Sequence, residues 1–220
     1  AALAVAGALT QTVSRNPLAS PDILGVTAGA SAAAVALIVA AGSGTLAGVL
    51  GALGLPLAAL CGALCTAAAV YVLAWRGGVE GFRLVLIGIG ANALFVALTN
   101  WMLVSADIND VSQAQVWLTG SLNGAGWSQV VPTAVALAVL TGWLATAAFT
   151  MGALRLGDET ARSLGVRLQT QRAVLLLSAC ALVGVATAAA GPIGFVALAA
   201  PQIALRLVRS PGPPLIASAL

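Results

Sequence analysis

The 220-residue chain alternates long apolar stretches with short segments that hold almost all of its charge. Of its residues, 60% are hydrophobic and only 7% are charged, a balance that excludes an ordinary soluble domain. A helix needs about 20 mostly apolar residues to cross a lipid bilayer. We therefore predict a shorter apolar helix at 193–208 and five membrane spans, at 22–41, 46–74, 83–105, 129–152 and 173–190.

These spans predict an all-α fold, a polytopic transmembrane helical bundle that forms one domain over residues 1–220. The chain opens within an apolar run, Ala1–Val13, without the charge pattern of a signal peptide. It closes within another apolar run that starts at Pro214. We therefore expect an internal fragment of a longer membrane protein, truncated at both ends.

Positive charge comes from nine arginines and no lysine. When the predicted spans are threaded through a membrane, every arginine falls on the same side: Arg15, Arg76, Arg83, Arg155, Arg162, Arg167, Arg172, Arg206 and Arg209. The loops on the opposite side hold no basic residue, and one of them carries Asp107 and Asp110. Because loops rich in arginine and lysine stay in the cytoplasm, the arginine side is predicted to be cytoplasmic.

Missing residue types exclude several mechanisms. Without lysine the chain has no phosphate-binding loop, so it does not hydrolyse ATP itself, and without histidine it lacks the usual proton shuttle and metal ligand. Coupling to protons or sodium is disfavoured, because carriers of that kind place ionisable groups inside the membrane. Cys61, Cys65 and Cys180 are interpreted as packing residues rather than metal ligands. All six acids are assigned to loops or helix ends: Asp22, Glu80, Asp107, Asp110, Asp158 and Glu159.

The first cytoplasmic segment, RNPLASPDILG, contains the parts of a capped helix start. Ser20 is predicted to cap the next helix, Pro21 suits its first turn, and Asp22 meets the positive end of the helix dipole. Gly25 and Gly29 are four residues apart and are expected to allow close contact with a neighbouring helix. Ordinary capping explains the central residues of this segment but not the whole of it.

A second cytoplasmic segment, LRLGDETARSLGV, predicts a short helix on the membrane surface. Gly157 and Gly165 bracket it, and within it Ala161 and Leu164 are expected to form an apolar edge while Arg162 and the acids face water. A helix this short is not stable alone, so it is expected to dock on something. A solvated charged loop between two spans is the alternative interpretation.

A third segment, GPIGFVALAAPQIALR, begins with the turn Gly191-Pro192 and carries a proline inside an apolar stretch. Proline inside a helix removes one backbone hydrogen bond, so Pro201 is expected to kink or divide this span. Gln202 places a polar amide at that break.

In this order and spacing, the three segments resemble the membrane subunit of the ABC importers for iron-siderophores, haem and cobalamin, across essentially the whole chain. The resemblance implies a ten-helix permease fold, of which the helices counted above would supply about seven. It implies that the second segment docks into a separate ATPase subunit, through Leu156, Gly157, Asp158, Glu159, Ala161, Arg162, Leu164 and Gly165. It also implies a cytoplasmic loop motif in the first segment, made of Arg15, Asn16, Pro17, Leu18, Pro21, Asp22 and Gly25.

The third segment departs from the family pattern. Members commonly have Pro-His where this chain has Pro201-Gln202, so a titratable imidazole is lost and a hydrogen-bonding or packing role is left for Gln202. Together with Gly191 and Pro192, these two residues form the predicted helix break.

The span at 83–105 corresponds to a helix that lines the pathway in the family. Asn92 and Thr99 lie seven residues apart, share one face of that helix and are predicted to line the translocation path. Hydrogen bonding to neighbouring helices is the alternative for both. Asn100 is expected at the membrane interface, where 117–122 is predicted to form an interfacial helix anchored by tryptophans.

The resemblance implies a non-enzymatic transmembrane subunit of an ATP-driven importer in the bacterial inner membrane. The implied partners are a second permease subunit, two cytoplasmic ATPase subunits that hold ATP and Mg, an extracytoplasmic substrate-binding protein and membrane lipid, with no directly bound cofactor and no nucleic acid. The sequence Ser20-Pro21-Asp22 favours a ferric siderophore as cargo, with cobalamin or haem as alternatives. An ion-coupled secondary transporter and a non-transporting membrane scaffold are the rival functions.

Overall fold

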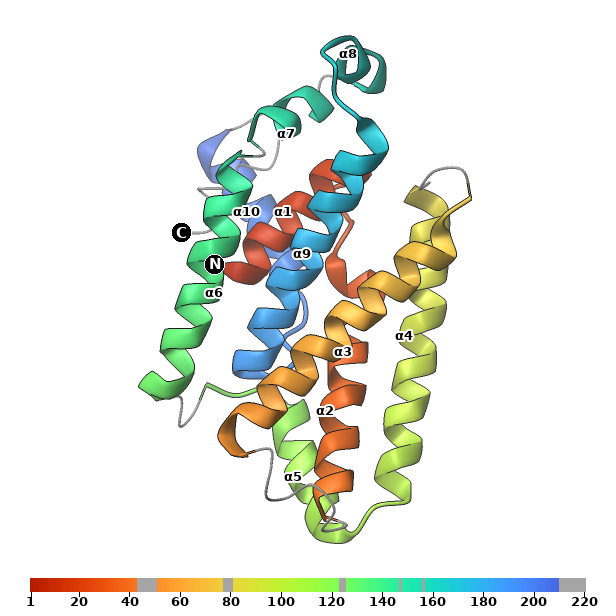
Figure 1. Ribbon diagram of the computed structural model, residues 1–220, viewed down its shortest axis with the longest axis vertical. Coiled ribbons are helices and arrows are strands. Elements are labelled where there is room, and N and C mark those ends of the chain that lie inside the picture. The colour runs from red at the N-terminus through yellow and green to blue at the C-terminus, as the bar shows by residue number, and fades with distance from the viewer. Residues whose placement is uncertain (43–50, 77–80, 123–125, 147, 156, 210–220) are drawn as a thin grey trace.

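The computed structural model describes residues 1–42, 51–76, 81–122, 126–146, 148–155 and 157–209, and the regular elements within those ranges are helices (Figure 1). They are α1 (Ala2–Ser14), the 3₁₀ turn η1 (Pro21–Leu24), α2 (Val26–Gly42), α3 (Gly51–Ala74), α4 (Gly81–Val104), α5 (Ile108–Leu118), α6 (Trp127–Thr146), α7 (Ala148–Arg155), α8 (Asp158–Ser163), α9 (Leu168–Ala190) and α10 (Val196–Val208). The predicted all-α helical bundle is confirmed.

Helix α9 forms the centre of the bundle. It packs against α1, α2, α3 and α6, while α2 packs between α3 and α4, and α1 packs against α10 (Figure 1). Lipid tails are as apolar as leucine side chains, so membrane helices gain most from close contact at small residues. Gly29 of α2 meets Thr66 and Gly62 of α3 in this way, without room for a side chain between them.

Three of the described helices are long and apolar enough to cross a membrane, namely Gly54–Ala74, Gly81–Val104 and Leu168–Ala190. They correspond to three of the five predicted spans, although residues 46–50 of the second lie outside the described part. The prediction of one continuous span at 22–41 is wrong. Gly25 adopts a left-handed conformation, with φ of 73°, which separates the turn η1 from the shorter helix α2.

Two helices, α6 (Trp127–Thr146) and α7 (Ala148–Arg155), cover the span predicted at 129–152, and residue 147 between them lies outside the described part. Helix α6 ends at Thr146, and α7 leaves the direction of α6 in Figure 1. Burial explains the change of direction, because Met151, Ala153 and Leu154 of α7 lie in the core and α7 packs against α1.

The interfacial helix predicted at 117–122 is wrong in its position. The helix in this region is α5, which ends at Leu118. Gly120 then adopts φ of 68°, and a Cβ atom there would lie 2.8 Å from the Pro192 carbonyl oxygen. The backbone N–H of Ser121 donates to the Ala190 carbonyl oxygen at 2.9 Å. The residues that follow α5 therefore pack with their backbone against the end of α9 and do not form a helix.

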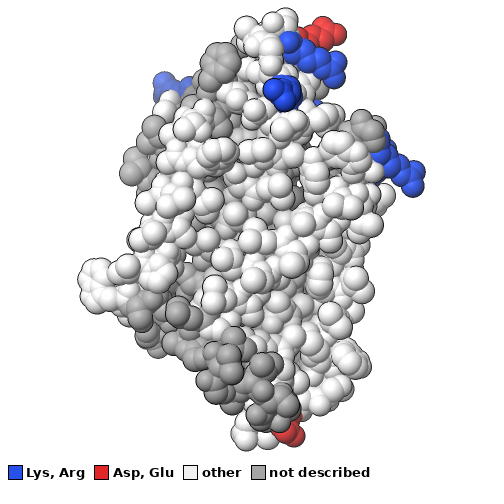
Figure 2. Space-filling model, in the orientation of Figure 1, with Lys and Arg blue, Asp and Glu red and all other residues white. Residues whose placement is uncertain are grey.

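Charged side chains gather at the two ends of the molecule. On the face drawn in Figure 2, arginines cluster at the end that carries α8, and acidic side chains occur there and at the opposite end, beside α5. Arg15, Gly81 and Arg172 line one small cavity of about 110 Å³, so the end of α1 and the starts of α4 and α9 lie together. This arrangement agrees with the predicted sorting of arginines to one end of the bundle.

Candidate functional site

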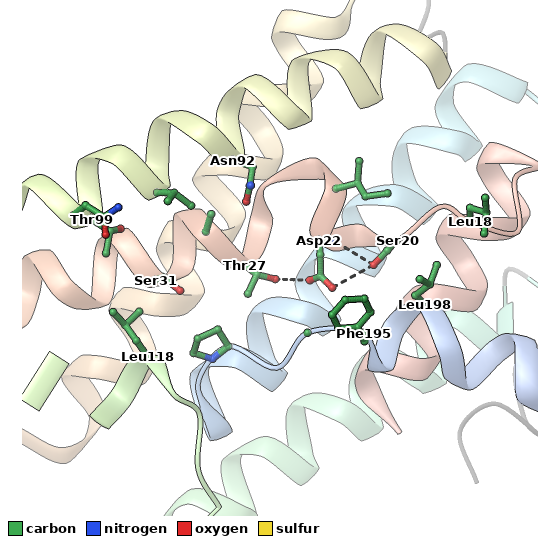
Figure 3. A pocket seen from close by; sticks show the side chains of 16 residues that line it. Leu18, Ser20, Asp22, Thr27, Ser31, Asn92, Thr99, Leu118, Phe195 and Leu198 are labelled. Carbon is green, nitrogen blue, oxygen red and sulfur yellow. Dashed lines mark hydrogen bonds between the residues drawn. The ribbon is translucent and has the colours of Figure 1, made fainter. Parts of the chain in front are cut away.

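A cavity of about 570 Å³ lies between the starts of α2 and α10, the face of α4 and the end of α5 (Figure 3). It collects residues that are far apart in the sequence. Leu18 of the first segment and Thr99 of α4 lie toward opposite ends of the view in Figure 3, and Phe195 of the third segment lies between the two. The cavity therefore joins the first and third segments to the predicted path residues.

The first segment enters the cavity wall as a capped turn. The Ser20 Oγ accepts from the Asp22 backbone N–H at 3.4 Å and donates to Asp22 Oδ2 at 3.2 Å, with Pro21 in the first turn of η1. The predicted cap is confirmed. Thr27 Oγ1 also donates to Asp22 Oδ1, at 2.6 Å, a partner that the sequence did not reveal. Two hydroxyl groups and the positive end of α2 thus stabilise the one carboxylate among the described residues of this wall.

The residues before this cap form a second turn. Asn16 Oδ1 accepts from the backbone N–H of Leu18 at 2.9 Å, which holds Pro17 and Leu18 outward, and the Leu18 side chain lines the cavity. Arg15 has φ of 48° at the end of α1, and its Nη2 donates to the Leu154 carbonyl oxygen of α7 at 3.0 Å. The loop motif thereby contacts α7 on one side and the cavity on the other.

Helix α4 supplies the opposite wall. Asn92 and Thr99 both line the cavity, so they share a face as predicted, and Asn100 lines it too. Thr99 Oγ1 donates to the Phe95 carbonyl oxygen of its own helix at 2.8 Å, not to a neighbouring helix. A role of Asn92 and Thr99 in transport stays a prediction. Close approach of α4 to η1 depends on Gly25, where a Cβ atom would lie 2.9 Å from the Asn92 backbone nitrogen.

The third segment closes the cavity from a third direction. Gly191 ends α9 with φ of 75°, and Phe195 precedes α10 with φ of 65°. Pro192, Phe195 and Leu198 line the cavity between these points and the first turn of α10. Helix α10 continues through Pro201 without interruption, so division of the span there, one of the two predicted outcomes, is wrong.

Gln202 has the hydrogen-bonding role that the sequence left open. Its Nε2 donates to Oε1 of Gln11 at 2.7 Å, and Nε2 of Gln11 donates to the Leu198 carbonyl oxygen at 3.2 Å. Gln11 was missed from the sequence, although it is a conspicuous amide within the apolar helix α1.

The second segment lies away from the cavity, at the arginine end (Figure 1). Gly157 and Gly165 bracket α8 with φ of 115° and 81°, and α8 ends in a Schellman motif, with the N–H of Val166 donating to the Ala161 carbonyl oxygen. The short helix between two glycines is confirmed. The shared apolar edge is wrong, because Ala161 is fully buried while Leu164 is 50% exposed.

Other predicted docking residues fit a solvent-facing α8. Glu159 and Arg162 are exposed as expected, Leu156 lies outside the described residues, and Asp158 is described only by its backbone. Among the thiols, Cys180 is buried, whereas Cys61 and Cys65 are exposed on α3. In the described ranges no group of three or more His, Cys, Asp or Glu residues is placed to hold a metal ion.

Removal of the Asp22 carboxylate is expected to weaken the first segment. Asp22→Ala leaves Ser20 and Thr27 without their shared acceptor, and loss of such a helix-start interaction costs about 1–2 kcal/mol. Thermal unfolding of the purified protein in detergent measures the loss. Asp107→Ala is the matched control, because Asp107 precedes α5 without a capping hydrogen bond from its side chain. Equal midpoints for the two variants would contradict the structural role of Asp22.

Comparison with known proteins identifies the family. The sequence profile of the FecCD transport family matches residues 1–220. The chain belongs to the FecCD transport family. Within this family, the achromobactin transport system permease protein CbrC of Dickeya dadantii (strain 3937) is 48% identical over 211 residues, which are 96% of this chain and 59% of that protein. The ferric enterobactin transport system permease protein FepG of Escherichia coli (strain K12) is 40% identical, over 94% of this chain and 61% of the relative.

More distant members of the family carry other cargo names. The cobalamin import system permease protein BtuC of Halobacterium salinarum is 36% identical over 96% of this chain and 55% of that protein. A solved structure, reported as a metal-chelate type ABC transporter in an inward-facing conformation, superposes with a TM-score of 0.85 at 26% identity and covers 99% of this chain and 68% of the other. The fold is thus that of an ABC transporter permease, and the chain spans about three-fifths of its curated relatives (59% and 61%).

Proposed function

We propose that the chain is part of the transmembrane subunit of an ATP-driven importer, and that the cavity of about 570 Å³ is its share of the translocation path. The observation that carries this proposal is the convergence of the first segment, the third segment and one face of α4 on one cavity. Polar groups of Ser20, Asp22, Thr27 and Asn92 lie in a wall that is otherwise mainly apolar. Such a wall can form hydrogen bonds with a polar chelate without binding the chelate tightly.

The same proposal gives α8 the role of docking into the ATPase. Its exposed Leu164 and the charged residues beside it face away from the bundle. The hydrogen bond from Arg15 to the Leu154 carbonyl oxygen joins the α7 helix, which packs against α8, to the loop motif at the cavity. Movement of α8 on ATP binding would therefore reach the cavity wall through α7 and Arg15.

The remaining partners follow from the family. The complete transporter would contain a second permease subunit, two cytoplasmic ATPase subunits that bind ATP and Mg, and an extracytoplasmic binding protein. It would lie in the bacterial inner membrane with the arginine end in the cytoplasm. We assign a ferric siderophore as cargo because the relatives with 48% and 40% identity are named for achromobactin and ferric enterobactin. Cobalamin or haem is the alternative, and the cobalamin permease at 36% identity supports it.

Uptake in membranes containing the complete transporter tests the proposed function. Accumulation of a radiolabelled ferric siderophore is expected to need ATP and an ATPase with an intact catalytic site, and to persist when an uncoupler removes the proton gradient. Uptake that survives a dead ATPase and stops with the uncoupler would instead support an ion-coupled carrier. Absence of uptake for every ferric chelate, with cobalamin or haem accumulated, would correct the cargo and keep the mechanism.

A further inference from the structure

Helices α1 and α10 are joined by an unusually close contact. Gly7 of α1 lies against the Ala197 carbonyl oxygen so closely that a Cβ atom at Gly7 would overlap it. One turn further along α1, Gln11 is only 3% exposed and bridges two parts of α10, the Leu198 carbonyl oxygen and the Gln202 side chain. Neither Gly7 nor Gln11 lines the cavity.

Pro201 leaves one carbonyl of α10 without a helical donor at this contact. A proline has no backbone N–H, so the Ala197 carbonyl, four residues earlier, receives no helical hydrogen bond from position 201. That carbonyl faces Gly7. Gln11 donates to the next carbonyl, that of Leu198, and accepts from Gln202 one turn beyond. A primary amide supplies the donor and the acceptor at once, which methionine or leucine of similar size does not.

The start of α10 depends on α1 for its position. The link from α9 to α10 passes through two positive φ values, at Gly191 and Phe195, and contains no helical turn between them. Phe195 and Leu198, on either side of the start of α10, line the cavity. The Gln11 side chain donates a hydrogen bond to the backbone carbonyl of Leu198.

We propose that Gln11 is a positioning residue for the cavity, which fixes the first turn of α10 against α1 so that Leu198 and Phe195 keep their places in the cavity wall. The inference rests on the proposed function of that cavity as a translocation path. Gln202 acts through Gln11, and the pair ties α10 to α1 beside the Ala197 carbonyl, which Pro201 leaves without a helical donor.

The transport test compares single variants in the complete transporter. Gln11→Met and Gln202→Met are expected to lower uptake turnover per assembled complex by about three- to tenfold, the range for one or two interhelical hydrogen bonds. The cargo concentration that gives half-maximal uptake is expected to stay unchanged, because the binding protein delivers the cargo at the end of the path opposite the ATPase. Gln202→His keeps a donor for Gln11 and is expected to restore turnover. The double variant is expected to be no slower than Gln11→Met, because both changes remove the same bond.

Thr12→Val provides the matched control. Thr12 is buried beside Gln11, but its hydroxyl donates to the Ala8 carbonyl oxygen of its own helix, at 2.7 Å. Turnover of this variant is expected to match the wild type. A Gln11→Met complex with wild-type turnover, or one that only assembles in lower yield, would overturn the positioning role. Failure of Gln202→His to restore turnover, or additive losses in the double variant, would overturn the pairing.

A labelling test reads the cavity wall without relying on transport. In a background with Cys61, Cys65 and Cys180 replaced by alanine, Leu198→Cys reports how accessible the first turn of α10 is to a water-soluble maleimide. Gln11→Met is expected to speed labelling about tenfold as the turn loosens, and Thr12→Val to leave it unchanged. Equal labelling rates in both would overturn the proposal. If the wild type shows no ATP-driven uptake of any ferric chelate, cobalamin or haem while labelling changes as expected, the proposed function fails and the positioning role stands.

Discussion

Replacement of Leu164 with aspartate is expected to abolish co-purification of the ATPase subunit and, with it, all ATP-driven uptake. Leu164, the C-cap residue of α8, exposes a large apolar side chain, whereas Ala161 within α8 is buried inside the chain. An apolar anchor at the centre of an interface contributes about 2 kcal/mol or more, which is about 30-fold in affinity. A carboxylate buried at that position of the interface with the ATPase adds the cost of burying an unpaired charge. Affinity purification from detergent-solubilised membranes, followed by quantification of the bound ATPase, measures the effect.

The structure also determines which control is informative. Gly157→Asp is a poor companion because Gly157 has φ of 115°, where any side chain strains the backbone whatever the partner does. Thr170→Asp adds the same charge at the same end of the bundle, on the exposed surface of α9's first turn, and is expected to retain the ATPase. If the Leu164→Asp complex kept its ATPase, the docking role of α8 would be withdrawn. If both variants lost equal amounts of the bound ATPase, the added charge alone would explain the effect.

The bracketing glycines of α8 show what short-range sequence signals predict well. A residue with a positive φ cannot continue an α-helix, so Gly157 and Gly165, with φ of 115° and 81°, flank α8 as predicted. The Ser20 cap is similar, because its partner Asp22 is only two residues away. When the residues that determine a local conformation lie within a few positions of one another, that conformation can be predicted from the sequence alone.

Breaks inside apolar runs are harder to predict. The hydropathy of 22–41 is continuous, so it gave no sign that Gly25 turns the chain with a positive φ. The decisive cause lies in α4, whose backbone at Asn92 approaches Gly25 more closely than a side chain permits. Gly25 and Gly29 were expected to form one smooth face, yet Gly25 meets α4 and Gly29 meets α3. Which helix a glycine meets is set by the packing of the whole bundle.

The candidate site divides in the same way. The three segments and the shared face of Asn92 and Thr99 came from the sequence, but only the fold shows that the first and third segments meet that face at one cavity. The partner of Gln202 was out of reach, because Gln11 is 191 residues away and nothing local marks the pair. Likewise, the exposure that distinguishes Leu164 from Ala161 depends on where α7 and α9 lie.

Substitution of Gly7 by alanine is expected to give the largest loss of stability among the glycine positions of α1 and α6, although alanine favours helix. At Gly7 the added methyl group meets the backbone carbonyl of Ala197, which cannot rotate away as a side chain can, so α1 and α10 must move apart. Overpacking of this kind costs about 1–3 kcal/mol, and the hydrogen bonds of Gln11 to α10 are strained by the same movement.

Gly142 in α6 supplies the opposite case, because an added Cβ atom there has no neighbour within 4 Å. Gly142→Ala is expected to raise stability by up to about 1 kcal/mol through helix propensity. Fluorescence-detected size exclusion after heating gives the unfolding midpoint of both variants from small amounts of detergent-solubilised protein. A Gly7→Ala protein as stable as Gly142→Ala would show that α1 and α10 separate at little cost. The close contact would then not be what holds the first turn of α10 at the cavity.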